Sequence, residues 1–342
     1  RTFNLIQSQT MNWPGTIGID AMLVNQGEVR NRGFEAQINW NQQVNKDWSY
    51  FVSGNFSYLK NWVSDIGVKN TDGTPGVWTG ITKNDAYFDG SYRNLPYMYQ
   101  TAEGEPLASF YLIKTDGIFQ SDAEAAAYVN KDGKRIQPDA VAGDLKFVDA
   151  NGDGVINDED RQYCGSATPK TTFSFSGGFT WKKLSVSAMF QGVAKRDWDP
   201  GTGAYFWGSG PYAQVTVFKE HLDYWSETNT GAYYPKPYIH TAGGVVPFRN
   251  KTMTLSDRYL QSGAYCRLKN LTVSYDIPAV WTKKVGLQKV QVFFSGENLL
   301  TFTTLKGMFD PEAIFTKNDY TAEGGKNYPM NKVISFGLVV NL

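Results

Sequence analysis

The chain has 342 residues, its 33 Lys and Arg balance its 33 Asp and Glu, and aromatic residues make up 15% of it. A net charge of zero argues against a nucleic-acid partner, which requires a basic excess. No run of about 18 apolar residues occurs, so no membrane-spanning helix is predicted.

The start of the sequence and its cysteines set further bounds. Residue 1 is Arg, and no charged-then-apolar leader follows it, so we expect a fragment of a longer protein. Cys164 and Cys266 lie far apart in sequence, which leaves both a disulfide and two free thiols open. His221 and His240 lack metal-ligand spacing, and we interpret both as ordinary loop residues.

Alternating residues first appear after a Gly- and Asn-containing loop at residues 8–33. From Phe34 to Trp40, and again from Trp48 to Tyr58, apolar residues alternate with Ser, Asn, Gln and Glu. A polar turn near 45–47 separates the two runs. Side chains alternate across a strand, so the pattern predicts an antiparallel hairpin with one apolar and one polar face.

A second hairpin is predicted by the run TTFSFSGGFTWKKLSVSAMFQGV, Thr171 to Val193. Lys182 and Lys183 form its tight turn. Each half is about 10 residues long, which suits a tilted membrane-crossing strand. Its apolar set, which we expect to face lipid, is Phe173, Phe175, Phe179, Leu184, Val186 and Phe190.

Three more strands follow. They are predicted from Leu271 to Ile277, where Pro278 ends the run, from Val290 to Glu297, and from Ile334 to Leu342. Phe293 falls on the otherwise polar face of the second of them. Phe336, Leu338 and Val340 form the apolar face of the last strand, and these too are expected to face lipid.

The connections between these strands alternate in length. Short ones lie near 44–47, 182–183 and 279–288, and long ones at 61–170, 194–263 and 303–331. Within the first long segment we expect one helix at 122–128 and one strand in 107–119. A soluble sandwich also alternates, but it does not segregate loop length by rim, and structureless connections of this size are rare in compact domains. The pattern therefore predicts an all-β, antiparallel transmembrane barrel with long extracellular loops.

Several stretches then resemble a known family, the SusC/RagA-type TonB-dependent outer-membrane transporters of Gram-negative bacteria. They lie in the family's order and span nearly the whole of residues 1–342. The matching stretches are NRGFE (31–35), LASFYLIKTDGIFQS (107–121), GDLKFVDANGDGVINDEDR (143–161), YLQSGAYCRLKNLTVSYDIP (259–278), VQVFFSGENLLTFT (290–303) and YPMNKVISFGLVV (328–340).

The resemblance implies the C-terminal strands of a large plugged barrel, with the plug domain outside this chain. It implies TonB as a partner, a SusD-like surface lipoprotein over the long loops, and a dimer of such transporter–lipoprotein pairs. The substrate would be an oligosaccharide or a peptide. One departure is Leu342, because such chains often end on an aromatic residue that assists assembly, a role that we expect Phe336 to take.

One short motif predicts a metal site. Asp149 to Asp160 reads DANGDGVINDED, which matches a calcium loop with Gly154 at its sharp turn. The last position is Asp rather than the bidentate Glu of an EF-hand, and the preceding GDLKFV is expected to be a strand. The alternative is an unoccupied Asp/Asn/Gly turn. The expected ligands of one structural Ca²⁺ are Asp149, Asn151, Asp153, the Val155 carbonyl, Asn157 and Asp160.

The long segments are rich in Trp and Tyr. Such rings either stack on a sugar, a peptide or a partner protein, or build the cores of the folded loops, which we expect for most of them. They are Trp62, Trp78, Tyr92, Tyr97, Tyr99, Trp198, Tyr205, Trp207, Tyr212, Tyr224, Trp225, Tyr233 and Tyr234. No catalytic motif is found, so an enzyme is not expected. The resemblance implies a nutrient importer, and the alternative is a surface adhesin or assembly barrel.

Overall fold

The computed structural model describes residues 1–9, 22–25, 27–66, 77–79, 99–199, 219–238, 254–306, 309–314 and 328–341. Some residues singled out above lie outside these ranges: Tyr92, Tyr97, Tyr205, Trp207, Tyr212, His240 and Leu342. The side chain of Trp78 is also outside what the structure describes.

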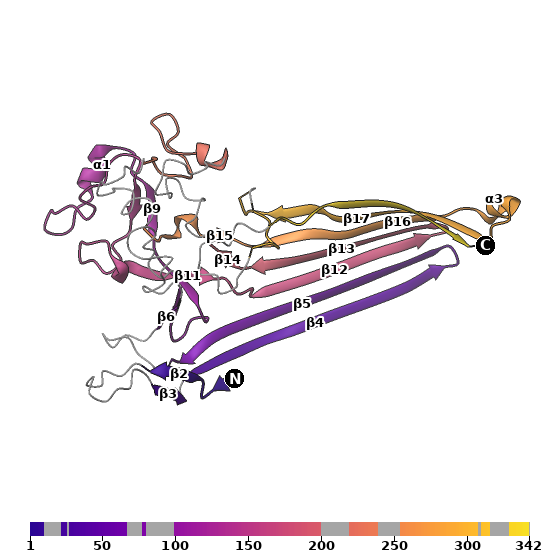
Figure 1. The fold of residues 1–342 in the computed structure, drawn as a ribbon, viewed down its shortest axis with the longest axis horizontal. Helices are drawn as coiled ribbons and strands as arrows, with labels where there is room; N and C mark the ends of the chain where they lie inside the picture. Colours follow the sequence, from indigo (N-terminus) through magenta and orange to yellow (C-terminus); the bar gives the residue numbers. More distant parts are fainter. Residues whose placement is uncertain are drawn as a thin grey trace.

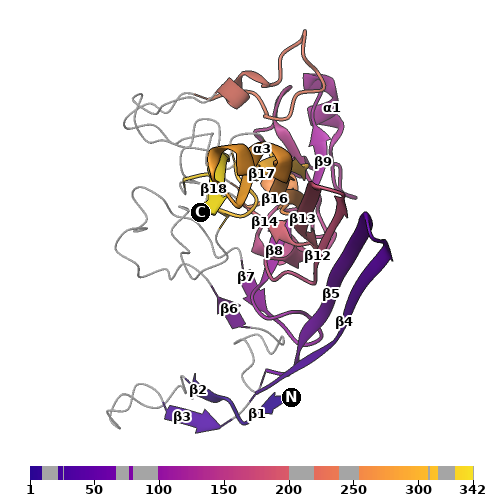
Figure 2. The ribbon, with the colours of Figure 1, turned by 90° about the vertical axis from the view of Figure 1, so that its right-hand side faces the viewer.

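An eight-stranded antiparallel sheet forms the body of the molecule, in the order β1-β4-β5-β12-β13-β16-β17-β18 (Figure 1). Seen from its end, it curves from β4 and β5 round to β17 and β18 (Figure 2). The strands are β1 Thr2–Phe3, β4 Glu28–Asn45, β5 Trp48–Asp65, β12 Thr171–Trp181, β13 Leu184–Lys195, β16 Tyr265–Asp276, β17 Lys289–Thr303 and β18 Val333–Asn341.

All predicted strands are present, and several are longer than their alternation indicated. β4 begins at Glu28, inside the segment expected to be a loop, and β5 continues to Asp65, inside the segment expected to be a long connection. Arg30 pairs with Trp62 in this extension, and the Asn61 amide donates to Asn31 Oδ1 at 2.7 Å. The backbone pairing of β4 with β5 therefore continues beyond the residues that alternate between apolar and polar.

Short connections gather at one end of the sheet, which we call the turn rim. Lys46 and Asp47 join β4 to β5, and Lys182 takes a positive φ of 55° in the tight turn before β13. Between β16 and β17, the expected linker contains a short helix, α3 Ala279–Thr282, and a 3-10 turn, η6 Lys283–Val285. Figure 1 shows α3 and the C-terminus at this end.

The expected lipid-facing side chains share one face of the sheet. Phe175 pairs with Phe190 across β12 and β13, with ring centroids 4.7 Å apart, and Phe294 pairs with Phe336. None of the nine predicted residues is buried, and Phe336 is 80% exposed. A soluble sandwich would cover such a face with a second sheet, and no described element does so. We call this side the apolar face and the opposite side the polar face.

The other end, which we call the loop rim, has smaller elements with cores of their own (Figure 1). β11 pairs with β8, and β8 with β7, so part of the expected irregular segment is a folded unit. The elements are β2 Ile6–Gln9, β3 Met22–Asn25, β6 Val77–Thr79, β7 Tyr99–Thr101, β8 Ser109–Ile113, β9 Thr115–Ile118, α1 Asp122–Ala127, β10 Leu145–Phe147, η3 Asp158–Asp160, β11 Arg161–Ser166, β14 Asp197–Trp198, η4 Lys219–Leu222, η5 Asp257–Tyr259 and β15 Gln261–Ser262. Within the described ranges, no helix has the length and apolar character needed to cross a bilayer.

Candidate functional site

The predicted calcium loop lies in the folded unit at the loop rim. It leaves β10, as the sequence indicated, and returns through η3 to β11. Gly152 and Gly154 take φ angles of 76° and 84°, in the left-handed region that favours glycine. A Cβ on Gly154 would fall 2.5 Å from the amide of Asn130, so this turn has room for glycine alone.

Acidic and amide side chains of the loop turn inward onto its backbone. Asp149 accepts from the N–H groups of Gly152 and Gly154, each at 2.8 Å. Asn151 and Asp153 each accept from the N–H two residues further on, at 3.0 and 2.8 Å. These are Asx turns, which Asp and Asn favour because their short side chains reach the backbone.

Asp160 closes the loop and is fully buried. Its two carboxylate oxygens accept from the N–H groups of Ala150 and Asn157, each at 2.8 Å. Asn157 in turn accepts from the N–H of Glu159, which completes a capping box at η3. The structure thus brings the predicted ligand residues into one closed loop, in which Asp160 has a structural role of its own.

The chemistry of this loop is compatible with a hard cation. A carboxylate oxygen carries two lone pairs, so an oxygen that accepts one N–H can still bind a metal ion. In the described part of the chain, no three His, Cys, Asp or Glu side chains are already grouped to hold one. Besides Asp149, Asp153 and Asp160, the expected ligands are the amide oxygens of Asn151 and Asn157 and the carbonyl of Val155, whose side chain is exposed.

The described loop aromatics build cores rather than open platforms. Trp225 is buried with Ile113 and Phe147, and its Nε1 donates to Gln120 Oε1 at 3.0 Å. Tyr234 is buried too, and burial raises its pKa to about 12. The remaining described members of the predicted set are buried or half-buried: Trp62, Tyr99, Trp198, Tyr224 and Tyr233. Most of these rings therefore stabilise the loops, as expected.

Sequence analysis missed a buried ionic cluster where the loop rim meets the sheet. Arg267 of β16 is 2% exposed, and its guanidinium contacts Asp310 at 2.7 Å and Glu312 at 2.5 Å. Lys269 also reaches Glu312, at 3.0 Å, and Arg267 Nε donates to Thr301 at 2.8 Å. This cluster ties the segment 309–314 to the polar face. The available signal was one Arg just before the strand predicted from Leu271, without any indication of its distant partners.

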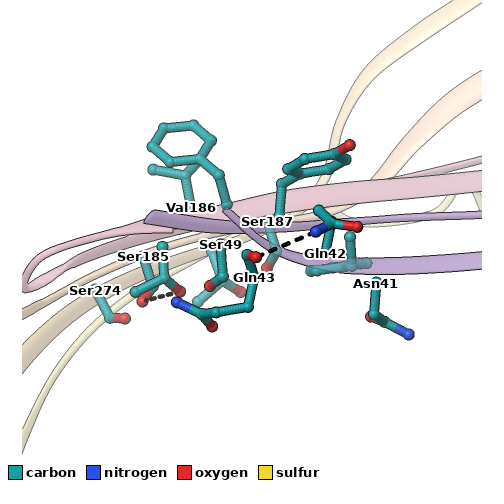
Figure 3. Close-up of a pocket in the computed structure, with 13 residues that line it drawn as sticks. Asn41, Gln42, Gln43, Ser49, Ser185, Val186, Ser187 and Ser274 are labelled. Carbon is teal, nitrogen blue, oxygen red and sulfur yellow. Dashed lines mark hydrogen bonds between the residues drawn. The ribbon is translucent and has the colours of Figure 1, made fainter. Parts of the chain in front are cut away.

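Near the turn rim, the polar face has a hollow of about 620 Å³. Ser49, Ser185 and Ser274 lie together there with Gln43 (Figure 3). Thr180 and Ser185 share a hydrogen bond of 3.0 Å across the hairpin. Hydroxyl and amide groups line this side of the hollow, and no charged side chain is among the described residues around it. Such a surface offers neutral hydrogen bonds to whatever packs against it.

Curated relatives and solved structures point to the same kind of protein. TonB-dependent receptor P3 of Formosa agariphila is 30% identical over 341 aligned positions, which cover 95% of this chain and 30% of that receptor. The chain matches the TonB-dependent receptors. TonB-dependent receptor P26 of the same organism is 25% identical over 334 positions, covering 96% of this chain and 30% of that receptor. No protein-family model matches the sequence.

Solved structures show the same fold. The RagAB peptide transporter matches with a TM-score of 0.60 at 20% identity, over 97% of this chain and 31% of that chain. The RagAB peptide importer in its "open-open" state matches with a TM-score of 0.61, also at 20% identity, over 98% and 31%. These structural matches confirm the all-β barrel fold, and the receptor P3 match bears out the resemblance to TonB-dependent receptors.

Two facts limit what these similarities show about this chain. The chain spans less than a third of the length of the curated relatives that it matches. The similar proteins are described as receptors, transporters and importers rather than as enzymes. TonB-dependent receptors are proteins of the outer membrane, which fits the bare apolar face described above.

Proposed function

We propose that this chain belongs to a transporter that imports an oligomeric nutrient, a glycan or a peptide, across the outer membrane with energy delivered by TonB. The observation that carries the proposal is the match to a TonB-dependent receptor along 95% of the chain. The RagAB structures, described as a peptide transporter and importer, support peptides as one of the two substrate classes.

In this proposal the long strands cross the outer membrane. Their apolar face meets lipid, because Phe175, Phe336 and Leu338 are exposed and would be costly in water. The polar face lines the lumen, the turn rim is periplasmic and the loop rim is extracellular, as in other outer-membrane barrels. The plug domain implied by the resemblance would pack on the polar face, with its neutral hollow at Ser49, Ser185 and Ser274 as one contact.

In this proposal a SusD-like surface lipoprotein binds at the loop rim. The folded unit there has its own buried cores, so it presents a shaped surface instead of loose chain. A lipoprotein over this surface would close a cavity above the plug. Two transporter–lipoprotein pairs would associate in the complete assembly.

The test is extraction of the intact native complex in gentle detergent, followed by uptake assays with fluorescent glycan and peptide oligomers in strains with and without TonB. We expect a co-purifying lipoprotein and uptake that is lost without TonB. Uptake that continues without TonB would overturn the transport mechanism. Partner binding without any uptake would favour the adhesin alternative, and a receptor that never retains a lipoprotein would remove that partner.

We further propose that the loop from Asp149 to Asp160 binds one Ca²⁺ in a structural role on the extracellular side. Two observations support this proposal. The loop carries a series of oxygen donors, and the Asp149 carboxylate already turns inward to accept from the N–H of Gly154 at the turn. Calcium would lock the loop against β8, which contacts η3. The ion's ligands would lie about 2.3–2.6 Å from it.

A further inference from the structure

The connection from β16 to β17 differs from the other two turns, because it is a small folded element that exposes large apolar side chains. It runs over residues 277–288 and contains α3 and η6. Val280, Trp281 and Val285 are 71%, 64% and 70% exposed. Covering such side chains is energetically favourable in water, so their exposure indicates that a partner binds here.

This element is held rigidly in place. Thr282, the last residue of α3, is buried, and its backbone carbonyl accepts from the N–H of Leu287 at 3.1 Å. Gly286 ends η6 in the left-handed region, at φ 78°. The N–H of Gln288 donates to the carbonyl of Asn341 in β18, and α3 contacts β17. The exposed apolar residues are therefore held by a fixed backbone, and little conformational entropy is lost when they bind a partner.

The charged side chains of the element are all positive. Lys283, Lys284 and Lys289 lie between residues 277 and 290, and this stretch contains no Asp or Glu. Lys289 contacts Asp276 at 3.3 Å. Among the described residues, Lys283 and Lys284 form no ion pair, and both are exposed. Two free ammonium groups beside an exposed Trp complement an anionic surface that also has an apolar layer.

The apolar face of the sheet leads directly to this element. Tyr275, Val292 and Leu338 pair across β16, β17 and β18, and all three are exposed. Figure 1 shows α3 just beyond the ends of these strands. The neighbouring hairpin repeats the combination, because Trp181 is half exposed and Lys182 Nζ lies 5.4 Å from its ring. Trp and Lys at the edge of an apolar band are typical of a membrane interface.

We propose that α3 and η6 form an interfacial anchor that binds anionic phospholipid headgroups at the periplasmic surface of the outer membrane. Val280, Trp281 and Val285 enter the boundary between headgroups and acyl chains, while Lys283 and Lys284 contact lipid phosphates. The proposal rests on the membrane-spanning arrangement proposed above. A periplasmic protein that docks on the same residues is the competing occupant.

The first experiment uses the intact receptor in nanodiscs of phosphatidylcholine with phosphatidylglycerol and counts retained lipids by native mass spectrometry. We expect Lys283→Gln/Lys284→Gln to lower the preference for phosphatidylglycerol by roughly thirtyfold, the order expected for two surface lysines. The matched control is Lys131→Gln/Lys134→Gln, two exposed lysines at the loop rim, which should leave the preference unchanged. An unchanged preference in the Lys283/Lys284 variant would overturn the anchor.

The second experiment locates Trp281 by fluorescence quenching with brominated lipids. The signal of Trp281 is the difference between the receptor and its Trp281→Phe variant, and the signal of Trp40, which lies on the apolar face, is obtained from Trp40→Phe. We expect bromines near the headgroup to quench Trp281 and deeper bromines to quench Trp40. If lipid quenches Trp40 while aqueous acrylamide alone quenches Trp281, the anchor is wrong and a protein partner is favoured. If lipid quenches neither, the membrane-spanning proposal fails as well.

Discussion

Phe293 of β17 lies across Gly337 of β18 on the polar face of the sheet. The two residues are direct partners in the strand register. A Cβ built on Gly337 would collide with the aromatic ring of Phe293, so the missing side chain is what gives the ring its place. The same arrangement recurs between Phe51 and Gly178, where a built Cβ would lie 2.5 Å from the ring. Large rings on the polar face are thus accommodated by glycine on the next strand.

Replacing Gly337 by Val should weaken the pairing of the last two strands. Either the ring of Phe293 or the backbone of β18 must move, and overpacking of this kind costs about 1–3 kcal/mol. We expect a lower unfolding temperature of the intact receptor in detergent, measured by circular dichroism. Adding Phe293→Ala should recover part of the loss, because the two changes act on one contact.

A matched control exists within the same sheet. A Cβ on Gly177 would meet its nearest atom, the carbonyl oxygen of Phe51, at 3.6 Å, which is an ordinary contact. Gly177→Ala should therefore leave the unfolding temperature nearly unchanged. Equal losses from the Gly177 and Gly337 substitutions would show that steric conflict with the ring is not the cause.

Strand positions were predictable because alternation is a local signal. The hairpin at Lys182 and the strand end before Pro278 follow from a few neighbouring residues. The ends of β4 and β5 did not follow, because polar residues occupy both faces there and only backbone pairing continues, as at Arg30 and Trp62. Both cysteines are free thiols in the structure, which decides between the two alternatives that the sequence left open.

Features made by distant segments were not predictable from one sequence. Trp225 packs with Ile113 and donates to Gln120, residues more than a hundred positions earlier. The Asp149 loop was visible because all its residues lie in one short run. In contrast, the cluster around Arg267 depends on Asp310, which is brought close by the path of the loop after β17. The alternation of apolar and polar residues carries no information about such a contact.

Replacing Arg267 by Met should release the segment 309–314 from the sheet. The change leaves the half-buried Asp310 and Glu312 without their main cationic partner, and about 3–5 kcal/mol, the cost of breaking a fully buried ion pair, is the upper bound of the loss. We expect faster amide hydrogen exchange at 309–314 in the intact receptor. Lys289→Met is the control, because its pair with Asp276 is exposed and should contribute at most about 1 kcal/mol. Unchanged exchange in the Arg267 variant would mean that other contacts hold this segment.

The same segment should loosen in acid. Burial alone raises the pKa of Asp310, but hydrogen bonds from Arg267 and from the N–H groups of Glu312 and Met330 outweigh it and hold the pKa below its ordinary value. A depressed pKa means that the contact stabilises the fold above the unfolded value, about pH 4, and that this stability is lost as the pH falls through the lower folded value. Hydrogen exchange at 309–314, corrected for its intrinsic pH dependence, should stay slow from pH 7 to 5 and rise below pH 4. A rise already at pH 6 would point to another group.

Removal of Asp149 should abolish calcium binding and loosen the loop without unfolding the barrel. Its carboxylate accepts from Gly152 and Gly154, so Asp149→Ala removes both the proposed ligand and the two contacts that shape the turn. We expect one Ca²⁺ per intact receptor by elemental analysis after purification without chelators, and none in this variant. Asp139→Ala, at an exposed carboxylate outside the loop, should retain the ion. Asp149→Asn is the milder change, because its single amide oxygen can still accept from one of the two N–H groups while the ligand charge is lost. Full calcium occupancy in Asp149→Ala, or no calcium in the unmodified receptor, would leave the loop as a self-sufficient Asx turn.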